Sequence, residues 1–245
     1  MKSCKEHKSK KIEFHVHTSF SKDSILSFVF ILMMCKLKKI DCLAITDHNE
    51  INGAIKYKEK LLKYGIDVIV GEEIFTRDGE IIGLFLNKKI EPYLSAEDTV
   101  KKIRKQKGLV YIPHPYDEKR YKTVITQEAL EKISKDIDFI EIHNGRNISE
   151  VFSSKQNEIA DKYNLRKIVG SDAHTFYELG RNYCLVNSYE KAELISNIED
   201  AIFNKKSCIR LAHQNTKLAR FIKIIGKGDF NELYRIVNRK CKRKK

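Results

Sequence analysis

The sequence predicts an α/β fold, most simply a β/α barrel with a helical appendage at the C-terminal end. Short β-rich segments alternate with helical segments along 245 residues, without an internal repeat or a Pro/Gly-rich linker. Such alternation is typical of parallel strands joined by helical crossovers. Six or seven consecutive units favour a closed barrel over an open sheet, and a hydrophobic content of 42% is enough for a core.

The strands are predicted from short runs of apolar, β-branched and aromatic residues that end at polar or turn residues. We expect them at 11–17, 42–48, 67–74, 80–86, 109–115, 138–144 and 166–174. The segments 67–74 and 80–86 are separated by the turn sequence TRDG, so we expect these two strands to form a hairpin.

Helices are expected between these strands, at 24–38, 52–65, 95–108, near 126–134, near 149–164 and from about 189 onward. The second ends at a glycine, and Ser95 with Asp98 three residues later resembles a capping box. The apolar run 25–35 is too short for a bilayer, which needs about 20 residues, and is expected to be a buried helix.

Composition and charge restrict the location and the partners. The six cysteines form no CxxC pair and the charged N-terminus has no signal-peptide pattern, so free thiols in a reducing cytoplasm are expected. The net charge of +14 favours anionic partners and no membrane partner is predicted. The final RIVNRKCKRKK is either a solvated basic tail or a nucleic-acid contact, and its composition does not separate these two alternatives.

Histidines gather where the predicted strands end. Six of the eight do so, namely His15, His17, His48, His114, His143 and His174. Carboxylates occupy similar positions at Asp47, Glu72, Glu73, Glu141 and Asp172. Each residue alone is more often structural, and an aspartate there can cap a helix. In a barrel, however, these ends meet on one face, and imidazole with carboxylate is the ligand set of zinc, manganese or iron.

The spacing within two motifs strengthens the prediction of a metal site. Residues i and i+2 of a strand face the same side, so His15 and His17 could grip one ion. Asp172 and His174 share this spacing and could serve neighbouring ions. A carboxylate has two oxygens and can bridge two ions, and Glu73 suits that role.

Six segments together resemble one known family. HVHTSFSKDS, AITDHNEINGA, VGEEI, IPHP, EIHNGRN and GSDAHTFYELG, which span about 11–187, are similar to the PHP (polymerase and histidinol phosphatase) family, in particular to its stand-alone phosphoesterases. The resemblance implies a distorted, seven-stranded TIM-like barrel that holds two or three divalent ions of Zn, Mn or Fe. It divides the chain into a basic segment (1–10), the barrel (11–188) and a helical, basic extension (189–245).

The resemblance also implies which residues hold each ion. His15, His17 and Asp172 would bind the first, and Glu73 would bridge to the second. His114 would complete the second; His143 is either its partner or a neutral substitution, because relatives often carry an aromatic residue there. Asp23, His48 and His174 would bind the third. Asp23 stands where a histidine is expected, which could weaken that site or change its metal preference. Glu13 replaces an aspartate of many relatives and keeps an acid there.

The expected activity is metal-dependent hydrolysis of a phosphate ester through a metal-bound hydroxide, without a protein nucleophile. The basic composition favours a nucleotide or a nucleic-acid end as substrate. Arg146 either binds a phosphate oxygen or is a surface arginine. A small-molecule phosphomonoesterase such as a histidinol phosphatase, an amidohydrolase, and a metal-stabilised nucleic-acid-binding module without activity are the alternatives. Amidohydrolases more often use a bridging modified lysine, whereas VGEEI supplies a carboxylate.

Overall fold

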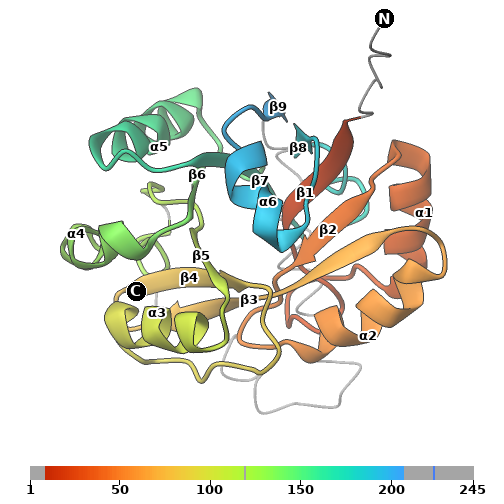
Figure 1. The fold of residues 1–245 in the computed structure, drawn as a ribbon, viewed down its shortest axis with the longest axis horizontal. Coiled ribbons are helices and arrows are strands. Elements are labelled where there is room, and N and C mark those ends of the chain that lie inside the picture. Colours follow the sequence, from red (N-terminus) through yellow and green to blue (C-terminus); the bar gives the residue numbers. More distant parts are fainter. Residues whose placement is uncertain (1–8, 119, 207–222, 224–245) are drawn as a thin grey trace, which may run out of the picture.

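A computed structural model describes residues 9–118, 120–206 and 223, and its strands are arranged around one central barrel (Figure 1). The strands are β1 (Lys10–Val16), β2 (Cys42–Ile45), β3 (Asp67–Thr76), β4 (Gly79–Leu84), β5 (Leu109–Ile112), β6 (Phe139–Asn144), β7 (Lys167–Ala173), β8 (Tyr183–Val186) and β9 (Ile202–Asn204). The helices are α1 (Phe28–Lys38), α2 (Asn52–Leu62), α3 (Ala96–Lys105), α4 (Gln127–Ile133), α5 (Glu150–Lys162) and α6 (Lys191–Asn197), with a 3₁₀ turn at Ser134–Asp136.

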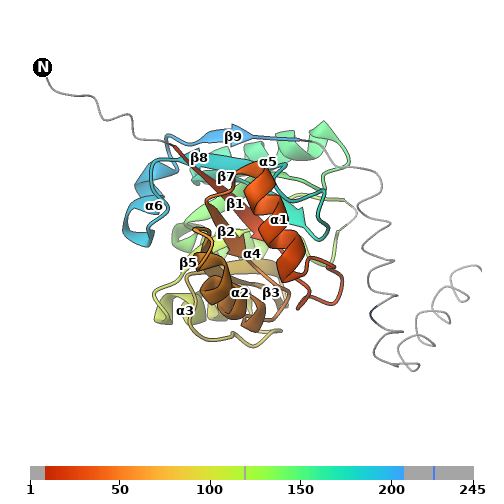
Figure 2. The same cartoon turned by 90° about the vertical axis from the view of Figure 1, so that its right-hand side faces the viewer.

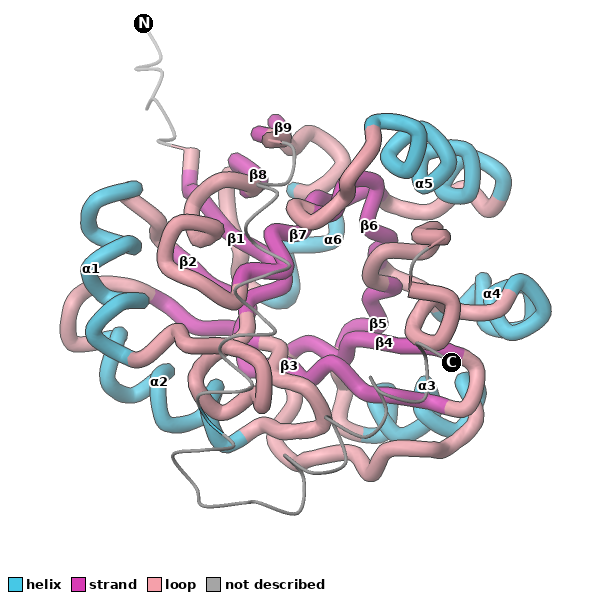
Figure 3. The backbone as a smooth tube through the Cα atoms, turned by 180° about the vertical axis from the view of Figure 1, so that it is seen from behind, coloured by secondary structure: helices cyan, strands magenta, loops and turns pink. Residues whose placement is uncertain are grey.

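Strands β1 to β7 close into a ring, because β1 pairs with both β2 and β7. Figure 3 shows this ring with the helices outside it. Of the seven ring strands, β4 runs antiparallel to both neighbours, and the other ring pairings are parallel. The expected barrel and the expected hairpin between β3 and β4 are both confirmed. Because β4 is reversed, its beginning lies at the rim where the parallel strands end.

The edge of β1 that does not pair with β2 is divided between β8 and β7. Its first half, from Lys10 to Ile12, pairs antiparallel with β8, whereas Phe14 and Val16 pair with β7. β9 extends the sheet from β8. Neither β8 nor β9 is among the predicted strands, and β9 lies in the extension that was expected to be helical. The rest of that extension (207–222 and 224–245) and residues 1–8 lie outside the described residues.

The helices cover the barrel on opposite flanks. Figures 1 and 2 place α1 and α2 on one flank and α3, α4 and α5 on the other. Ser95 accepts a hydrogen bond from the backbone N–H of Asp98, which confirms the predicted N-cap of α3. The expectation of a buried helix at 25–35 is wrong in part. α1 begins only at Phe28, and because it lies outside the barrel it buries one face and exposes residues such as Val29 and Leu37.

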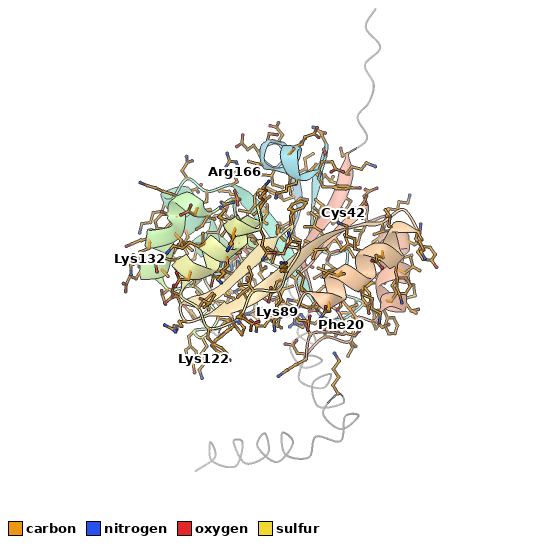
Figure 4. All side chains as sticks on the ribbon, turned by 60° about the horizontal axis from the view of Figure 1, so that its bottom comes forward. Phe20, Cys42, Lys89, Lys122, Lys132 and Arg166 are labelled. Atoms are coloured by element: carbon orange, nitrogen blue, oxygen red, sulfur yellow. The ribbon has the colours of Figure 1, made fainter. Side chains whose placement is uncertain are left out.

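The barrel interior is apolar below the rim. Its largest fully buried side chains include Phe14, Tyr111 and Phe139, and the ring of Phe14 contacts the other two. Figure 4 shows Lys122 and Lys132 at the periphery, while Cys42 is buried. Cys35 and Cys184 are also buried and free, as expected, whereas the other three cysteines lie outside the described residues. Within the described part of the chain, no helix has the length and apolarity that a membrane span requires.

Candidate metal centre

The rim of the barrel brings eight of the nine predicted ligands together. Six of them are fully or almost fully buried, and Asp23 and His48 are the more accessible members. The eight residues are His15, His17, Asp23, His48, Glu73, His114, Asp172 and His174. The strand-end argument predicted that seven of these residues would meet, although they are up to 159 positions apart in the chain, from 15 to 174. Asp23, the eighth, was expected from the family resemblance alone.

Glu73 lies at the centre of the cluster. Its Oε1 is 3.2 Å from Nε2 of His15 and 3.1 Å from Nε2 of His114. Its Oε2 is 3.3 Å from Nε2 of His17 and 2.9 Å from Nδ1 of His48. Each oxygen thus faces a different pair of imidazoles, which is the arrangement expected of a carboxylate that bridges two cations.

Asp172 and Asp23 extend the cluster toward the pocket. Oδ1 of Asp172 lies 3.4 Å from Nε2 of His17 and 3.4 Å from Nδ1 of His174. Asp23 lies between His174 and His48, at 3.5 Å and 3.6 Å from their Nε2 atoms. The three residues assigned to a third ion therefore form one group. Lys223 donates two hydrogen bonds to the carbonyls of Ser19 and Ser21, in the loop that carries Asp23.

Three site residues have a left-handed backbone. The φ angles are 66° at His15, 28° at His114 and 51° at Asp172. Such angles are uncommon for residues other than glycine. The pairing of β1 with β2 and β7 shifts register next to His15, so the strand bulges there. The bulge at the rim helps to aim the His15 side chain into the site, as bulges near active sites often do.

Outer contacts fix which nitrogen of two histidines faces the centre. Nδ1 of His15 lies 3.1 Å from Oε1 of the buried Glu141, so the ring donates its N–H there and keeps a lone pair at Nε2. Ser21 donates to Asp47 at 2.7 Å, so its oxygen can accept from Nδ1 of His17 at 3.3 Å. Both rings therefore direct Nε2, the atom that would bind a cation, at Glu73.

The protonation tendencies agree with a site that requires cations. Burial, together with the neighbouring His174 and His48, holds the pKa of His17 well below its usual value, so this imidazole is neutral. Burial alone would lower the pKa of His15. The negative charges of Glu73 and of the other carboxylates nevertheless raise this pKa well above its usual value. In the absence of other cations, a proton on His15 would balance this negative charge. A bound metal ion would supply the same compensation.

Several buried atoms of the cluster lack a hydrogen-bond partner. They are Nε2 of His15, Nε2 of His17, Oδ1 of Asp23, Oε2 of Glu73 and Nδ1 of His114. Buried polar atoms in proteins are nearly always satisfied, so this concentration needs an explanation. Four overlapping groups of these side chains place their ligand atoms within 4.8 Å of one another, namely His15/His17/Glu73, His15/His114/Asp172, His17/His48/His174 and His48/Glu73/Glu80. The donor set therefore fits divalent cations.

His143 does not join the other eight residues. β6 shifts register between Glu141 and His143, and the ring of His143 turns toward the start of α5. There Nδ1 lies 2.8 Å from Oγ of Ser153 and Nε2 lies 3.4 Å from the carbonyl of Lys206. The proposal that His143 completes the second ion is thus not supported by its position, and the hydrogen bonds explain its presence.

Arg146 is neither exposed nor free. It forms two hydrogen bonds with Glu178, at 2.9 Å and 3.2 Å, and is almost fully buried. The alternative of a surface arginine is therefore wrong. Arg146 also borders a pocket of about 340 Å³ beside the cluster, together with Arg120 and Lys122. Nη1 of Arg120 lies 2.6 Å from Oδ2 of Asp172, which joins the basic wall of the pocket to the metal centre.

Sequence reasoning did not assign three residues of this site. Glu141 was noted among the strand-end carboxylates, but its role in orienting His15 depends on side-chain direction. Glu80 stands at the beginning of a strand, to which the strand-end argument does not apply; the predicted hairpin is the signal that brings this beginning to the rim. Arg120 lies in the loop between β5 and α4, where the sequence gives no periodic pattern.

Comparisons with known proteins agree with this picture. The family model described as PHP domain matches residues 13–243. The uncharacterized protein MJ1587 of Methanocaldococcus jannaschii is 43% identical over 116 residues, covering 43% of this chain and 68% of the relative. The uncharacterized protein MJ0417 of the same organism is 35% identical over 175 residues, covering 71% of this chain and 69% of the relative.

One solved structure supports the fold. A two-domain protein of Bacteroides vulgatus, described as containing a predicted PHP-like metal-dependent phosphoesterase, has a TM-score of 0.65 at 18% identity. The match covers 80% of this chain and 65% of that protein, so the chain spans slightly less than two thirds of it. At this identity the likeness shows a shared architecture, a closed seven-stranded barrel with surrounding helices.

Proposed function

The chain belongs to the PHP domain family, a family of metal-dependent phosphoesterases, and from this premise we propose that it hydrolyses a phosphate ester at the rim of the barrel. One observation supports this most strongly. A buried carboxylate, Glu73, lies within 3.3 Å of nitrogens from four histidines, and several of the surrounding atoms have no hydrogen-bond partner. Such a cluster is stable only with compensating positive charge.

The residues divide into groups that would hold two or three ions. His15, His17 and Asp172 would hold one, Glu73 would bridge to a second beside His114, and Asp23, His48 and His174 would hold a third. Bound divalent cations would neutralise phosphate oxygens and lower the pKa of a coordinated water toward neutrality. The ligand types suit zinc, manganese or iron.

The basic wall of the pocket would position the substrate. Arg120, Arg146 and Lys122 line the pocket. Arg120 is paired with Asp172, and Arg146 is paired with Glu178. Guanidinium groups match phosphate oxygens in a planar, bidentate geometry. Because both arginines are held by carboxylates, their positions are fixed before a phosphate arrives, and less ordering is required on binding.

We favour a nucleotide or a nucleic-acid end as the substrate. The formal charge of +14 would attract a polyanion, and the pocket opens beside exposed basic residues such as Lys122. The basic segment RIVNRKCKRKK (235–245) could add a nucleic-acid contact, but it lies outside the described residues. A small phosphomonoester is the alternative, and a comparison of turnover on an oligonucleotide and on free phosphomonoesters separates the two. Turnover on an oligonucleotide should also fall steeply with salt.

The experiment that tests the activity uses the full chain freed of metal and reloaded with Mn²⁺ or Zn²⁺. Release of p-nitrophenol from p-nitrophenyl phosphate and from its bis-ester is measured with and without chelator, alongside a nucleotide panel. We expect metal-dependent turnover on at least one substrate. Loss of turnover in a His15→Ala/His17→Ala double variant would link the activity to this cluster. Absence of metal-dependent turnover on every ester would contradict the proposal.

A further inference from the structure

Glu80 enters the site from a direction that the other ligands do not use. It is the second residue of β4, the reversed strand of the barrel, and pairs with Phe75 of β3. Phe75 lies two residues after Glu73, and side chains two residues apart on a strand share a face. Glu80 therefore stands diagonally across the strand pair from Glu73, on the same face of the sheet.

The carboxylate of Glu80 faces two imidazoles of the metal centre. Its Oε2 lies 3.5 Å from Nε2 of His114, and its Oε1 lies 3.7 Å from Nδ1 of His48. These are two of the histidines that Glu73 contacts, at 3.1 Å and 2.9 Å. Two carboxylates from adjacent strands thus flank the same pair of rings, and His48, Glu73 and Glu80 offer ligand atoms within 4.8 Å of one another.

A purely structural role does not explain this placement. Glu80 is only 6% exposed, yet among the described residues no lysine or arginine lies within ion-pair distance of its carboxylate and no backbone N–H donates to it. The groups that face it are the imidazole nitrogens of His48 and His114, and Glu73 offers a ligand atom within 4.8 Å of its own. A buried carboxylate that faces only imidazoles and a second carboxylate is costly unless a cation lies between them.

From this geometry we infer that Glu80 is a further ligand of the metal centre, which completes the coordination of the ion held by Glu73 and His114. The inference rests on the proposed metal centre, but not on the identity of the substrate. It gives that ion a second carboxylate, so the site would have more oxygen ligands than the strand-end residues alone supply. Oxygen-rich sites favour manganese over softer alternatives.

The test compares Glu80→Gln with Glu72→Gln. Glu72 is the matched control, because it is also a buried glutamate of the β3/β4 hairpin but accepts a hydrogen bond from the N–H of Ile90 at 2.8 Å. As the residue before Glu73 on the strand, it faces the opposite side. Metal-free full-length proteins are titrated with Mn²⁺ and with Zn²⁺ by calorimetry, and bound metal is counted by elemental analysis after dialysis.

We expect Glu80→Gln to lose one ion per chain, or to bind it about tenfold more weakly or worse, while Glu72→Gln matches the wild type. Without metal, Glu80→Gln should melt no lower than the wild type, because it removes a carboxylate next to Glu73. With Mn²⁺ it should melt lower. Equal stoichiometry and affinity in Glu80→Gln and the wild type would overturn the inference alone. A wild-type protein that binds no ion would overturn the proposed metal centre as well, so the two failures are distinguishable.

Discussion

Nδ1 of His15 lies 3.1 Å from Oε1 of Glu141, and this contact leaves Nε2 of the same ring directed at Glu73. Glu141 also accepts hydrogen bonds from the hydroxyl of Tyr111 and from the N–H of His114 at 2.6 Å. One buried carboxylate therefore orients two residues of the metal centre. Carboxylates in this position keep the imidazole in the ligating tautomer and raise its basicity.

Glu141→Gln should weaken metal binding about 10- to 100-fold, because an amide cannot accept all the donors that meet the carboxylate. The affinity is measured by calorimetry with Mn²⁺. Glu128→Gln is a suitable control, since Glu128 is an exposed glutamate of α4 that pairs with Lys132 on the surface. Wild-type affinity in Glu141→Gln would show that the His15 ring needs no outer partner.

Gly170→Ala should damage the same contact through the backbone. A Cβ atom at Gly170 would overlap Oε1 of Glu141 and approach the hydroxyl of Tyr111 to 2.8 Å. The carboxylate would have to leave His15, so both thermal stability and metal affinity should fall. Gly65→Ala is the comparison, because a Cβ there meets no neighbouring atom and only the positive φ of 70° is unfavourable. Gly65→Ala should lose some stability and keep full metal affinity.

Metal removal should lower the melting temperature of the wild type. Ions that bind the folded chain alone stabilise it by an amount that grows with the logarithm of their concentration, about 2.7 kcal/mol at 100 times the dissociation constant. The double variant His15→Ala/His17→Ala should show a much smaller difference with and without chelator in differential scanning calorimetry. An equal shift in the double variant would place the stabilising ions elsewhere in the molecule.

His143 should influence the pH dependence of stability instead of metal content. Burial lowers the pKa of His143 below its usual value of 6.5. The unfolded chain therefore takes up this proton before the folded chain does, so stability is complete above pH 6.5 and declines as the pH falls below it. Relative to the wild type, His143→Gln should lose less stability between pH 7 and pH 5 in urea unfolding. Its metal content should equal that of the wild type; a missing ion would make His143 a ligand after all.

The two arginines of the pocket should differ in what they control. Arg146→Gln leaves the buried carboxylate of Glu178 without its cation and should destabilise the fold by about 3 kcal/mol in urea unfolding. The side chain of Arg120 is 20% exposed, and Arg120→Gln should leave the protein folded but raise KM for a phosphate ester at least tenfold. A KM unchanged in Arg120→Gln would remove this residue from the phosphate pocket.

The positions of most candidate ligands could be predicted from sequence because strand ends are local features. His15, His48 and His174 each follow a short apolar run, and a closed barrel brings such ends together regardless of their distance along the chain. Glu73 was predicted for the same reason. The ring closure itself also followed from the regular alternation of strands and helices, which needs no side-chain detail.

The remaining features depend on direction and register, which local patterns do not specify. His143 sits at a strand end like the others, but a one-step register shift in β6 turns its ring toward Ser153. The position of Glu80 at the rim follows only from the reversed direction of β4, which brings the beginning of that strand to the rim. The short β8 and β9 strands contain few residues. β8 is a strand because the first residues of β1 offer it a free edge, and β9 in turn pairs with β8.

The left-handed residues at the rim imply that the backbone of this barrel is strained at the positions that would hold the ions. Three positions, His15, His114 and Asp172, each keep a backbone that glycine would adopt more easily, at a cost of about 1–3 kcal/mol apiece. Glycine at any of these positions should therefore remove the ligand side chain but relieve the backbone strain. Alanine should remove the side chain and leave the strain in place. The rim of the barrel, more than its apolar interior, is then the part of the molecule where backbone stability is lost in order to place the candidate ligands.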